Sequence, residues 1–269
     1  MVAPFFINRD NRMFNDFQNK HVVVTGASSG IGFAVAEAFV NHGAIVYIVA
    51  KNDDIFIAEK KLQKLSNKKV TALKCDISCN ESLKNEFSKI DTIDVFIANA
   101  GVEFPTPIND NSNENMENFQ NIINTNVTGT YLSIKNAIDK IPDRGCILIT
   151  SSIWGKTAVP EFSAYISSKH ANLGLMKVLA KELGTREIRV NAVCPGWVKT
   201  APAMHSLKKM ALHQNTSQET LLNELASEQC FGEVQEPNDV ALCYLMLASS
   251  YAINITGQAV NADRGALVV

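Results

Sequence analysis

Short β-branched runs alternate with longer helical patterns along nearly the whole chain, and this alternation strongly limits how the chain can fold. Seven runs are predicted to be strands, at residues 21–26, 44–50, 70–76, 94–101, 146–152, 188–196 and 258–263. The main helical patterns fall between them, at residues 30–42, 54–66, 80–90, 114–140, 163–184 and 237–249. Strands that alternate with helices build a parallel sheet with helices on both faces. An α/β fold with a doubly wound parallel sheet of about seven strands is therefore predicted.

No repeat or low-complexity linker marks an internal domain boundary. Residues 1–19 are interpreted as an N-terminal extension that is loose or bound to a neighbouring subunit, and residues 20–269 as one domain. The segment 201–236 is polar, rich in Met, His, Lys and Gln, and of uncertain secondary structure. Because an insertion of this length in a compact fold is often a binding element, we predict that it is a substrate lid.

Charge and cysteine content exclude several classes of function. The formal net charge is −2, which gives no electrostatic footprint for nucleic acid or an anionic membrane. No apolar run is long enough to span a bilayer, and the apolar stretch at the start is too short and broken for a secretory signal. Six cysteines show no CxxC pair and no zinc spacing, so we expect reduced thiols, no metal and a cytoplasmic protein.

Three glycines follow the first predicted strand, in the stretch VVVTGASSGIG. Gly26, Gly30 and Gly32 lie between this strand and the next helix, where small residues let the backbone approach a pyrophosphate. The start of the helix adds free N–H groups and the positive end of its dipole. The spacing is G-x-x-x-G-x-G rather than the usual G-x-G-x-x-G, but its place after the first strand favours a Rossmann-like dinucleotide site.

The end of the second strand bears on the choice between the two nicotinamide dinucleotides. An acidic residue at this place binds the ribose 2′-hydroxyl of NAD, whereas a basic residue accepts the 2′-phosphate of NADP. The sequence here is IVAKNDD, in which Lys51 follows Ala50. NADP is therefore the preferred prediction, although Asp53 and Asp54 lie close by and Lys51 could be an ordinary solvated side chain.

Tyr165 and Lys169 lie four residues apart in a helical pattern and thus share one helix face. Most pairs of this kind are surface contacts. A cation beside a phenol, however, lowers the pKa of the phenol, as an acid/base catalyst that works near neutral pH requires.

Eight motifs in chain order resemble those of the short-chain dehydrogenase/reductase family and cover nearly all of residues 20–265. They are TGASSGIG (25–32), CDI (75–77), NAG (99–101), NTNVTG (124–129), ITSS (149–152), YISSK (165–169), PGWVKT (195–200) and ITGQAVNADRG (255–265). Two positions depart from the family pattern: Arg264 stands where a glycine is common, and Lys51 stands where Arg is more frequent.

The resemblance implies specific residues for each role. The catalytic set would be Asn126, Ser152, Tyr165 and Lys169, with Ser152 preferred to Ser151 because it lies thirteen residues before Tyr165. Besides Tyr165 and Lys169, the cofactor would contact Gly26, Ser28, Ser29, Gly30, Ile31, Gly32, Lys51, Asp76, Ile77, Asn99, Ala100, Gly101, Pro195, Gly196, Val198 and Thr200. The substrate would contact Ser152, Trp154, Phe162, Tyr165 and Trp197.

Several of these residues also have purely structural interpretations. Asn126 could hold a water next to Lys169, or it could distort its helix and satisfy nearby backbone groups. Asp76 could close a strand-end turn, and Pro195 with Gly196 could form a simple turn. Trp154, Phe162 and Trp197 could each be packing residues rather than an aromatic substrate cleft.

The resemblance implies an oxidoreductase that transfers a hydride between NADP(H) and a ketone, an aldehyde or a secondary alcohol. A small-molecule substrate and a homodimer or homotetramer are expected, the latter built on the long helical patterns at 114–140 and 163–184. Two alternatives remain open: a non-catalytic dinucleotide-binding sensor of the same fold, and a relative that uses the bound cofactor for isomerisation or dehydration.

Overall fold

The structure is a computed structural model that describes residues 15–268. Seven strands form one parallel sheet in the order β3-β2-β1-β4-β5-β6-β7. Their bounds are β1 His21–Thr25, β2 Ile45–Ala50, β3 Val70–Lys74, β4 Val95–Ala98, β5 Cys146–Thr150, β6 Arg189–Pro195 and β7 Ala259–Ala262. The predicted parallel sheet of about seven strands is confirmed.

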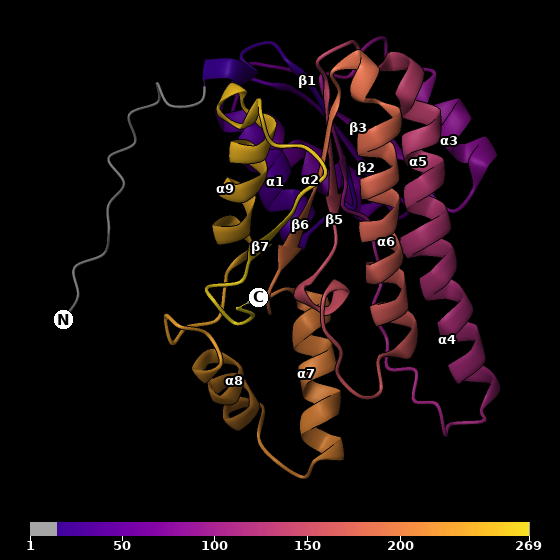
Figure 1. The fold of residues 1–269 in the computed structure, drawn as a ribbon, viewed down its shortest axis with the longest axis vertical. Helices are drawn as coiled ribbons and strands as arrows, with labels where there is room; N and C mark the ends of the chain where they lie inside the picture. Colours follow the sequence, from indigo (N-terminus) through magenta and orange to yellow (C-terminus); the bar gives the residue numbers. More distant parts are fainter. Residues whose placement is uncertain (1–14, 269) are drawn as a thin grey trace.

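Helices cover both faces of this sheet (Figure 1). One face carries α1 (Gly30–Asn41), α2 (Asp54–Gln63) and α9 (Pro237–Ala248). The other carries α3 (Asn80–Phe87), α5 (Thr130–Ala137) and α6 (Ser163–Glu182), with α4 (Asn113–Ile123) packed against α6. Strand residues alternate between two apolar clusters, so that Val22 and Val24 face α1 and α9 whereas Val23 faces the opposite layer.

The helical stretch predicted at 114–140 is not one regular helix. Residues Asn124–Gly129 form a π-helical segment between α4 and α5, and a short 3-10 turn follows at Ile138–Lys140. A π segment inserts an extra residue into a helix and re-aims the side chains around it. Here it carries Asn126, which is fully buried.

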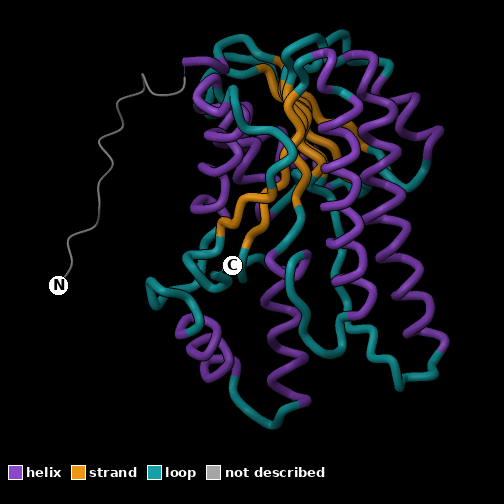
Figure 2. The backbone as a smooth tube through the Cα atoms, in the orientation of Figure 1, coloured by secondary structure: helices purple, strands orange, loops and turns teal. Residues whose placement is uncertain are grey.

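Segment 201–236 contains α7 (Ala201–His213) and α8 (Gln218–Ser227), which extend beyond the carboxyl ends of the strands (Figures 1 and 2). The two helices bury Leu207, Ala211 and Leu221 in a small apolar cluster of their own, and Trp197 packs against it. The hydroxyl oxygen of Thr200 caps α7 by accepting a hydrogen bond from the N–H of Ala203 at 3.3 Å.

Most of the extension predicted at residues 1–19 lies outside the described residues. Residues 16–19 contact the domain: Phe17 is 2 % exposed and meets the ring of Phe39 edge-on, with 4.8 Å between centroids. The Asp16 carboxylate accepts hydrogen bonds from the backbone N–H and the hydroxyl of Ser250, at 2.8 and 2.7 Å. Residues 16–19 are thus anchored to the body of the same chain.

Arg264, which stands where the family commonly has glycine, adopts a left-handed backbone conformation with φ of 52°. Such a conformation favours glycine because it brings Cβ close to the backbone. The arginine side chain is fastened by its guanidinium, which forms ion pairs with Asp239 at 2.9 Å and Glu233 at 3.4 Å. These contacts join the C-terminal loop to the start of α9.

Candidate active site

The glycine-rich loop between β1 and α1 forms an open cradle. α1 begins at Gly30, and its N-cap residue Ser29 makes no side-chain capping bond, so the first turn keeps N–H groups available to a ligand. Gly26 and Gly30 have positive φ, at 68° and 58°. A Cβ on Gly32 would lie 2.2 Å from the carbonyl oxygen of Gly26, so this approach of loop and helix requires glycine. These features fit the pyrophosphate of a dinucleotide.

The NAG motif packs directly behind this loop. The Asn99 side-chain amide donates to the carbonyl oxygens of Thr25 and Gly26, at 3.0 and 3.3 Å. The Thr25 hydroxyl oxygen accepts from the backbone N–H groups of Asn99 and Ala100, at 2.9 and 3.0 Å. The contacts lie at the carboxyl ends of β1 and β4, where the sheet order reverses and open α/β sheets bind ligands.

Of the remaining predicted cofactor residues, Thr200 lies against this cradle, and the others are packed in neighbouring segments. Thr200 Cγ2 lies 3.3 Å from the place a Cβ would take on Gly30, which brings the PGWVKT loop over the glycine loop. Ile77 is buried under Gly129, whereas Val198 is buried and forms a bridge with Gln235. A Cβ on Gly196 would lie 2.9 Å from the Asp263 side chain, so its turn is tightly packed.

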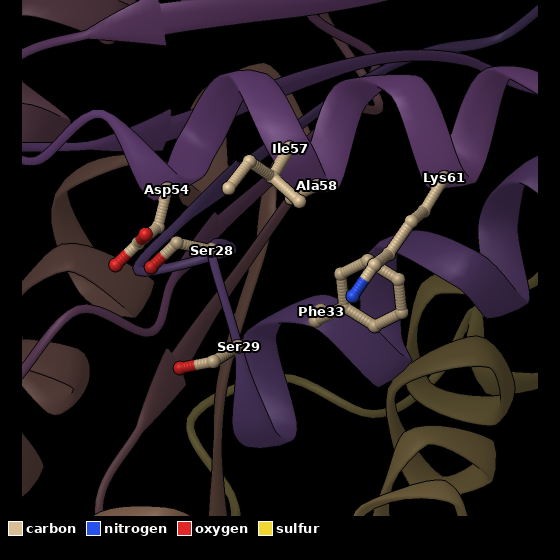
Figure 3. A pocket seen from close by; sticks show the side chains of 7 residues that line it. All are labelled: Ser28, Ser29, Phe33, Asp54, Ile57, Ala58 and Lys61. Carbon is tan, nitrogen blue, oxygen red and sulfur yellow. The ribbon is translucent and has the colours of Figure 1, made fainter.

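Ser28 and Ser29 face a hollow between α1 and α2 that Asp54, Ile57, Ala58, Lys61 and Phe33 also line (Figure 3). Lys51 is exposed at the end of β2. Of the two neighbouring acids, Asp53 is paired with Lys74 at 2.7 Å, and the Asp54 carboxylate accepts from the Asn52 amide at 2.9 Å. Both signs of charge are therefore present near the hollow.

Asp76 closes a turn at the end of β3, where its carboxylate accepts from the N–H and the hydroxyl of Ser78 at 2.9 and 2.7 Å. Burial favours a higher pKa for Asp76, but the Ser78 hydrogen bonds and the Lys51 charge outweigh it and lower the pKa. The contacts of the Asp76 side chain therefore match the interpretation that it closes a strand-end turn. Lys51 is close enough for its charge to lower the pKa of this carboxylate.

Tyr165, Lys169 and Ser152 come together at the carboxyl end of β5. The Lys169 Nζ lies 5.3 Å from the centroid of the Tyr165 ring, and the Ser152 hydroxyl is close enough to the phenol to lower its pKa. Lys169 is 4 % exposed, and its Nζ donates to the Thr150 carbonyl oxygen at 3.0 Å. Ser151 is engaged elsewhere, since its hydroxyl donates to the backbone carbonyl of Lys169 at 2.9 Å.

The ionisation of this cluster differs from the simple expectation that Lys169 lowers the pKa of Tyr165. Burial raises the pKa of Tyr165, the Glu103 carboxylate raises it further, and the Ser152 hydrogen bond opposes both. Burial lowers the pKa of Lys169 to about 8, although Glu103 and Cys194 favour its charged form. Desolvation outweighs pairing here because it penalises both the phenolate and the ammonium.

The amide of Asn126 is occupied mainly by neighbouring protein groups. Its Nδ2 donates to the Val102 carbonyl at 2.9 Å and the Ser168 hydroxyl at 3.0 Å, and its Oδ1 accepts from the Val102 N–H at 2.8 Å. Only the second lone pair of Oδ1 remains for a water. The contacts of the side chain therefore match the structural interpretation, with Gly101 packed against Oδ1.

The three predicted aromatic substrate residues differ in their surroundings. Trp154 is partly exposed and meets the Tyr165 ring edge-on, with 6.0 Å between the ring centroids. Phe162 is 4 % exposed and packs behind Trp154 at 5.1 Å. Trp197 packs against the apolar cluster of α7 and α8.

Glu103, which the resemblance implies as part of the substrate wall, and two residues outside the predicted site, Thr150 and Tyr244, have polar groups near the cluster. Glu103 lies in the loop after the NAG motif, and the Ser206 hydroxyl of α7 is close enough to its carboxylate to affect the carboxylate's pKa. Burial raises the pKa of Glu103, opposed by Lys169 and Ser206. Thr150 could have been noticed as the one polar residue that ends the apolar run CILIT, whereas Tyr244 lies in an apolar helix and gives no such signal.

The fold and this site define a dinucleotide-binding α/β protein with a tyrosine, a lysine and a serine gathered beside the cofactor cradle. A family profile described as enoyl-(acyl carrier protein) reductase matches residues 26–266. The chain belongs to the short-chain dehydrogenase/reductase family, an oxidoreductase family whose members bind NAD(P).

Known relatives agree over nearly the full length. The chain is 35 % identical to short chain aldehyde dehydrogenase 1 of Euphorbia lathyris, over 92 % of this chain and 88 % of the relative. It is 34 % identical to the 3-oxoacyl-(acyl-carrier-protein) reductase of Chlamydia muridarum, over 92 % and 97 %. The aldohexose dehydrogenase of Thermoplasma acidophilum superposes with a TM-score of 0.81 at 30 % identity, covering 94 % of this chain and 96 % of that structure.

Among the described residues, no helix is long and apolar enough to cross a membrane. Within the same part of the chain, no group of three or more His, Cys, Asp or Glu could hold a metal ion.

Proposed function

We propose that the protein is an NADP(H)-dependent oxidoreductase that interconverts a ketone or aldehyde with the corresponding alcohol, with Tyr165 as the acid/base. The observation that carries this proposal is the convergence of Tyr165, Ser152 and Lys169 at one end of β5, beside the glycine cradle. A phenol, a hydroxyl donor and an ammonium at one point are what proton transfer at a substrate oxygen requires.

When bound, the nicotinamide ring supplies or accepts the hydride. Tyr165 gives a proton to the substrate oxygen in reduction and takes one in oxidation. Ser152 donates a hydrogen bond to the same oxygen and orients it. Because burial raises the pKa of the Tyr165 phenol, the protonated form that reduction needs is already favoured.

Lys169 would support this proton transfer through the N–H donors of its ammonium group. One of its three N–H donors holds the Thr150 carbonyl, which leaves two for the nicotinamide ribose and for a water. A water between Lys169 Nζ and Asn126 Oδ1 would connect Tyr165 to solvent. Both of these atoms lie beside Gly101, at 3.6 and 3.2 Å from the place that a Cβ would take there.

The cofactor itself would be held by three segments. The glycine loop with Ser28, Ser29 and Ile31 would hold the pyrophosphate, and Asp76 with Ile77 and the NAG motif would flank the adenine. The loop from Pro195 to Thr200 would hold the carboxamide of the nicotinamide. The observed contact between Thr200 and Gly30 supports this arrangement.

The preference for NADP rests on Lys51, and Asp53, which precedes α2 as its N-cap residue, is paired with Lys74. Lys51→Ala should weaken NADPH binding about fivefold to tenfold and leave NADH nearly unchanged, because it removes a charge-assisted bond to the 2′-phosphate. Asp54→Asn should act in the opposite direction, and Lys64→Ala, at the far end of α2, is the matched control. Equal losses for both dinucleotides would contradict the preference.

Catalysis is tested with Tyr165→Phe, which removes only the phenolic oxygen. Turnover should fall at least about a hundredfold while dinucleotide binding is retained. Tyr251→Phe, at a site that is 70 % exposed, is the control and should change neither. Unaltered turnover in Tyr165→Phe would remove this residue from its role.

The substrate is best found with a panel of steroids, quinones, sugars and acyl thioesters, each tried with both dinucleotides. Trp154 beside Tyr165 supports a partly aromatic cleft, and the nearness of Ser206 in α7 to the Glu103 carboxylate supports segment 201–236 as its lid. Dinucleotide binding with no turnover of any carbonyl or alcohol would favour the sensor alternative. Product formation without net change in nicotinamide absorbance would favour isomerisation or dehydration.

A homodimer or homotetramer is proposed because apolar side chains are exposed on the outer helices, namely Met116, Phe119, Tyr131 and Val178. Light scattering should show an oligomer, and Tyr131→Glu should shift it towards the monomer. A cytoplasmic location is proposed as well, with support from six cysteines that are all unpaired.

A further inference from the structure

A chain of hydrogen bonds crosses the sheet behind the proposed site. It begins at Tyr244 of α9, which is fully buried and whose hydroxyl lies 2.6 Å from the Thr150 hydroxyl oxygen. The Thr150 hydroxyl lies 3.1 Å from Asn99 Oδ1. Asn99 in turn donates to the Thr25 and Gly26 carbonyls of the glycine loop.

The direction of every donor in this chain is fixed by chemistry. The Asn99 nitrogen must face Thr25 and Gly26, since carbonyl oxygens only accept, and so its oxygen faces Thr150. The Thr150 hydroxyl has one hydrogen, which it donates to that oxygen. The hydrogen between Tyr244 and Thr150 must therefore come from Tyr244.

Thr150 links this series of hydrogen bonds to Lys169, the proposed catalytic lysine. Its carbonyl oxygen accepts from Lys169 Nζ at 3.0 Å, while its hydroxyl connects Tyr244 with Asn99. α9 and α6 cover opposite faces of β5, so Thr150 joins the two helix layers at the end of this strand (Figure 1). A small movement of Thr150 would therefore shift both Lys169 and Asn99, whose amide is bonded to the glycine loop.

Tyr244 belongs to the apolar cluster that includes Val240 and Leu245, and the titratable groups near its phenol are Cys243, Cys194 and Tyr165. Burying a hydroxyl there costs free energy unless it is paired, and a phenylalanine would fill nearly the same space without that cost. Burial also raises the pKa of Tyr244, which keeps the phenol protonated as a donor. The hydroxyl is accounted for by its bond to Thr150.

We propose that Tyr244 is a positioning residue for hydride transfer, which acts through Thr150 to hold Lys169 and Asn99 in place for the bound dinucleotide. It contacts neither substrate nor cofactor. The inference rests on the proposed function, because that function gives Lys169 and the glycine loop their roles.

Tyr244→Phe tests this, because it removes the donor and keeps the ring. We expect the Kd for NADPH, followed by its fluorescence without turnover, to rise about fivefold to tenfold, as for a buried acceptor that loses its partner. Thr150→Val should give a similar loss, and Thr150→Ser, which keeps a hydroxyl, should bind nearly as tightly as the unmodified protein. The double variant Tyr244→Phe/Thr150→Val should bind no more weakly than either single variant.

A second measurement separates positioning from general loosening of the fold. Lys169 faces Tyr165, Glu103 and Cys194. Its Nζ donates to the Thr150 carbonyl, and a hydrogen bond to the charged form of a group favours that form. A looser Thr150 should therefore move the alkaline limb of kcat/KM to lower pH in Tyr244→Phe. Tyr47→Phe loses a tyrosine hydroxyl on another strand, which is partly buried and lies 3.4 Å from His21 Nδ1, and it should leave both Kd and pH profile unchanged.

The outcomes separate this inference from the function on which it rests. If the unmodified protein binds NADPH and Tyr244→Phe binds equally well with an unchanged pH profile, the positioning role is wrong and the proposed function stands. A double variant with additive losses would also overturn the role. If the unmodified protein binds neither NADPH nor NADH, both the proposed function and this inference fail.

Discussion

Replacing Gly32 by alanine should destabilise the protein even though alanine is the better helix former. In α1, alanine would gain about 1 kcal/mol over glycine by intrinsic propensity. A Cβ at this position, however, would lie 2.2 Å from the Gly26 carbonyl oxygen and 2.5 Å from the Asn99 amide nitrogen. The first is a backbone atom that cannot rotate away, so the loop itself has to move. Overpacking of this kind costs about 3 kcal/mol, which leaves a net loss of about 2 kcal/mol.

Urea denaturation and dinucleotide titration measure the two consequences, which are a lower free energy of unfolding and a weaker Kd. Gly174→Ala is the matched control, because Gly174 also lies inside a helix but has nothing within 4 Å of its would-be Cβ. It should raise the free energy of unfolding by about 0.5–1 kcal/mol. A Gly32→Ala variant as stable as the unmodified chain, with unchanged binding, would refute the reasoning.

Three further predictions follow from burial and charge. Lys169→Met should raise the free energy of unfolding at pH 7 by up to about 3 kcal/mol, because the pKa of Lys169 falls from 10.5 to about 8 on folding. This gain in stability should shrink as the pH rises from about 8 towards 10.5, and a gain that is constant with pH would contradict the prediction. Glu103→Gln should move the pH profile of alcohol oxidation to lower pH, because the Glu103 carboxylate raises the pKa of Tyr165. A move of the profile to higher pH would contradict this effect of Glu103 on Tyr165. Phe17→Ala should cost about 3 kcal/mol in urea denaturation, whereas Phe231→Ala, at a side chain 74 % exposed, should cost little; equal small losses would show that residues 15–19 do not contribute to the core.

The sequence determined the features that depend on local periodicity. Alternating strands and helices predicted the parallel sheet, and the glycine spacing after the first strand predicted the cradle at Gly30. A four-residue spacing on one helix predicted that Tyr165 and Lys169 face the same way, as they do. Such predictions succeed because helix and strand periods place nearby residues by geometry alone.

The tertiary structure decided everything that depends on which strands become neighbours. Thr150, Asn99 and Tyr244 are far apart in the chain and meet only because β4 and β5 pair while α9 packs on the same sheet. The same contacts show that Ser151 is engaged with the Lys169 backbone and that the Asn126 amide is used by Val102. The ionisation of the site was also decided at this level, because burial of Tyr165 and Lys169 outweighs the pairing that their spacing suggests. Desolvation depends on the whole surrounding fold, and no local pattern in a sequence records it.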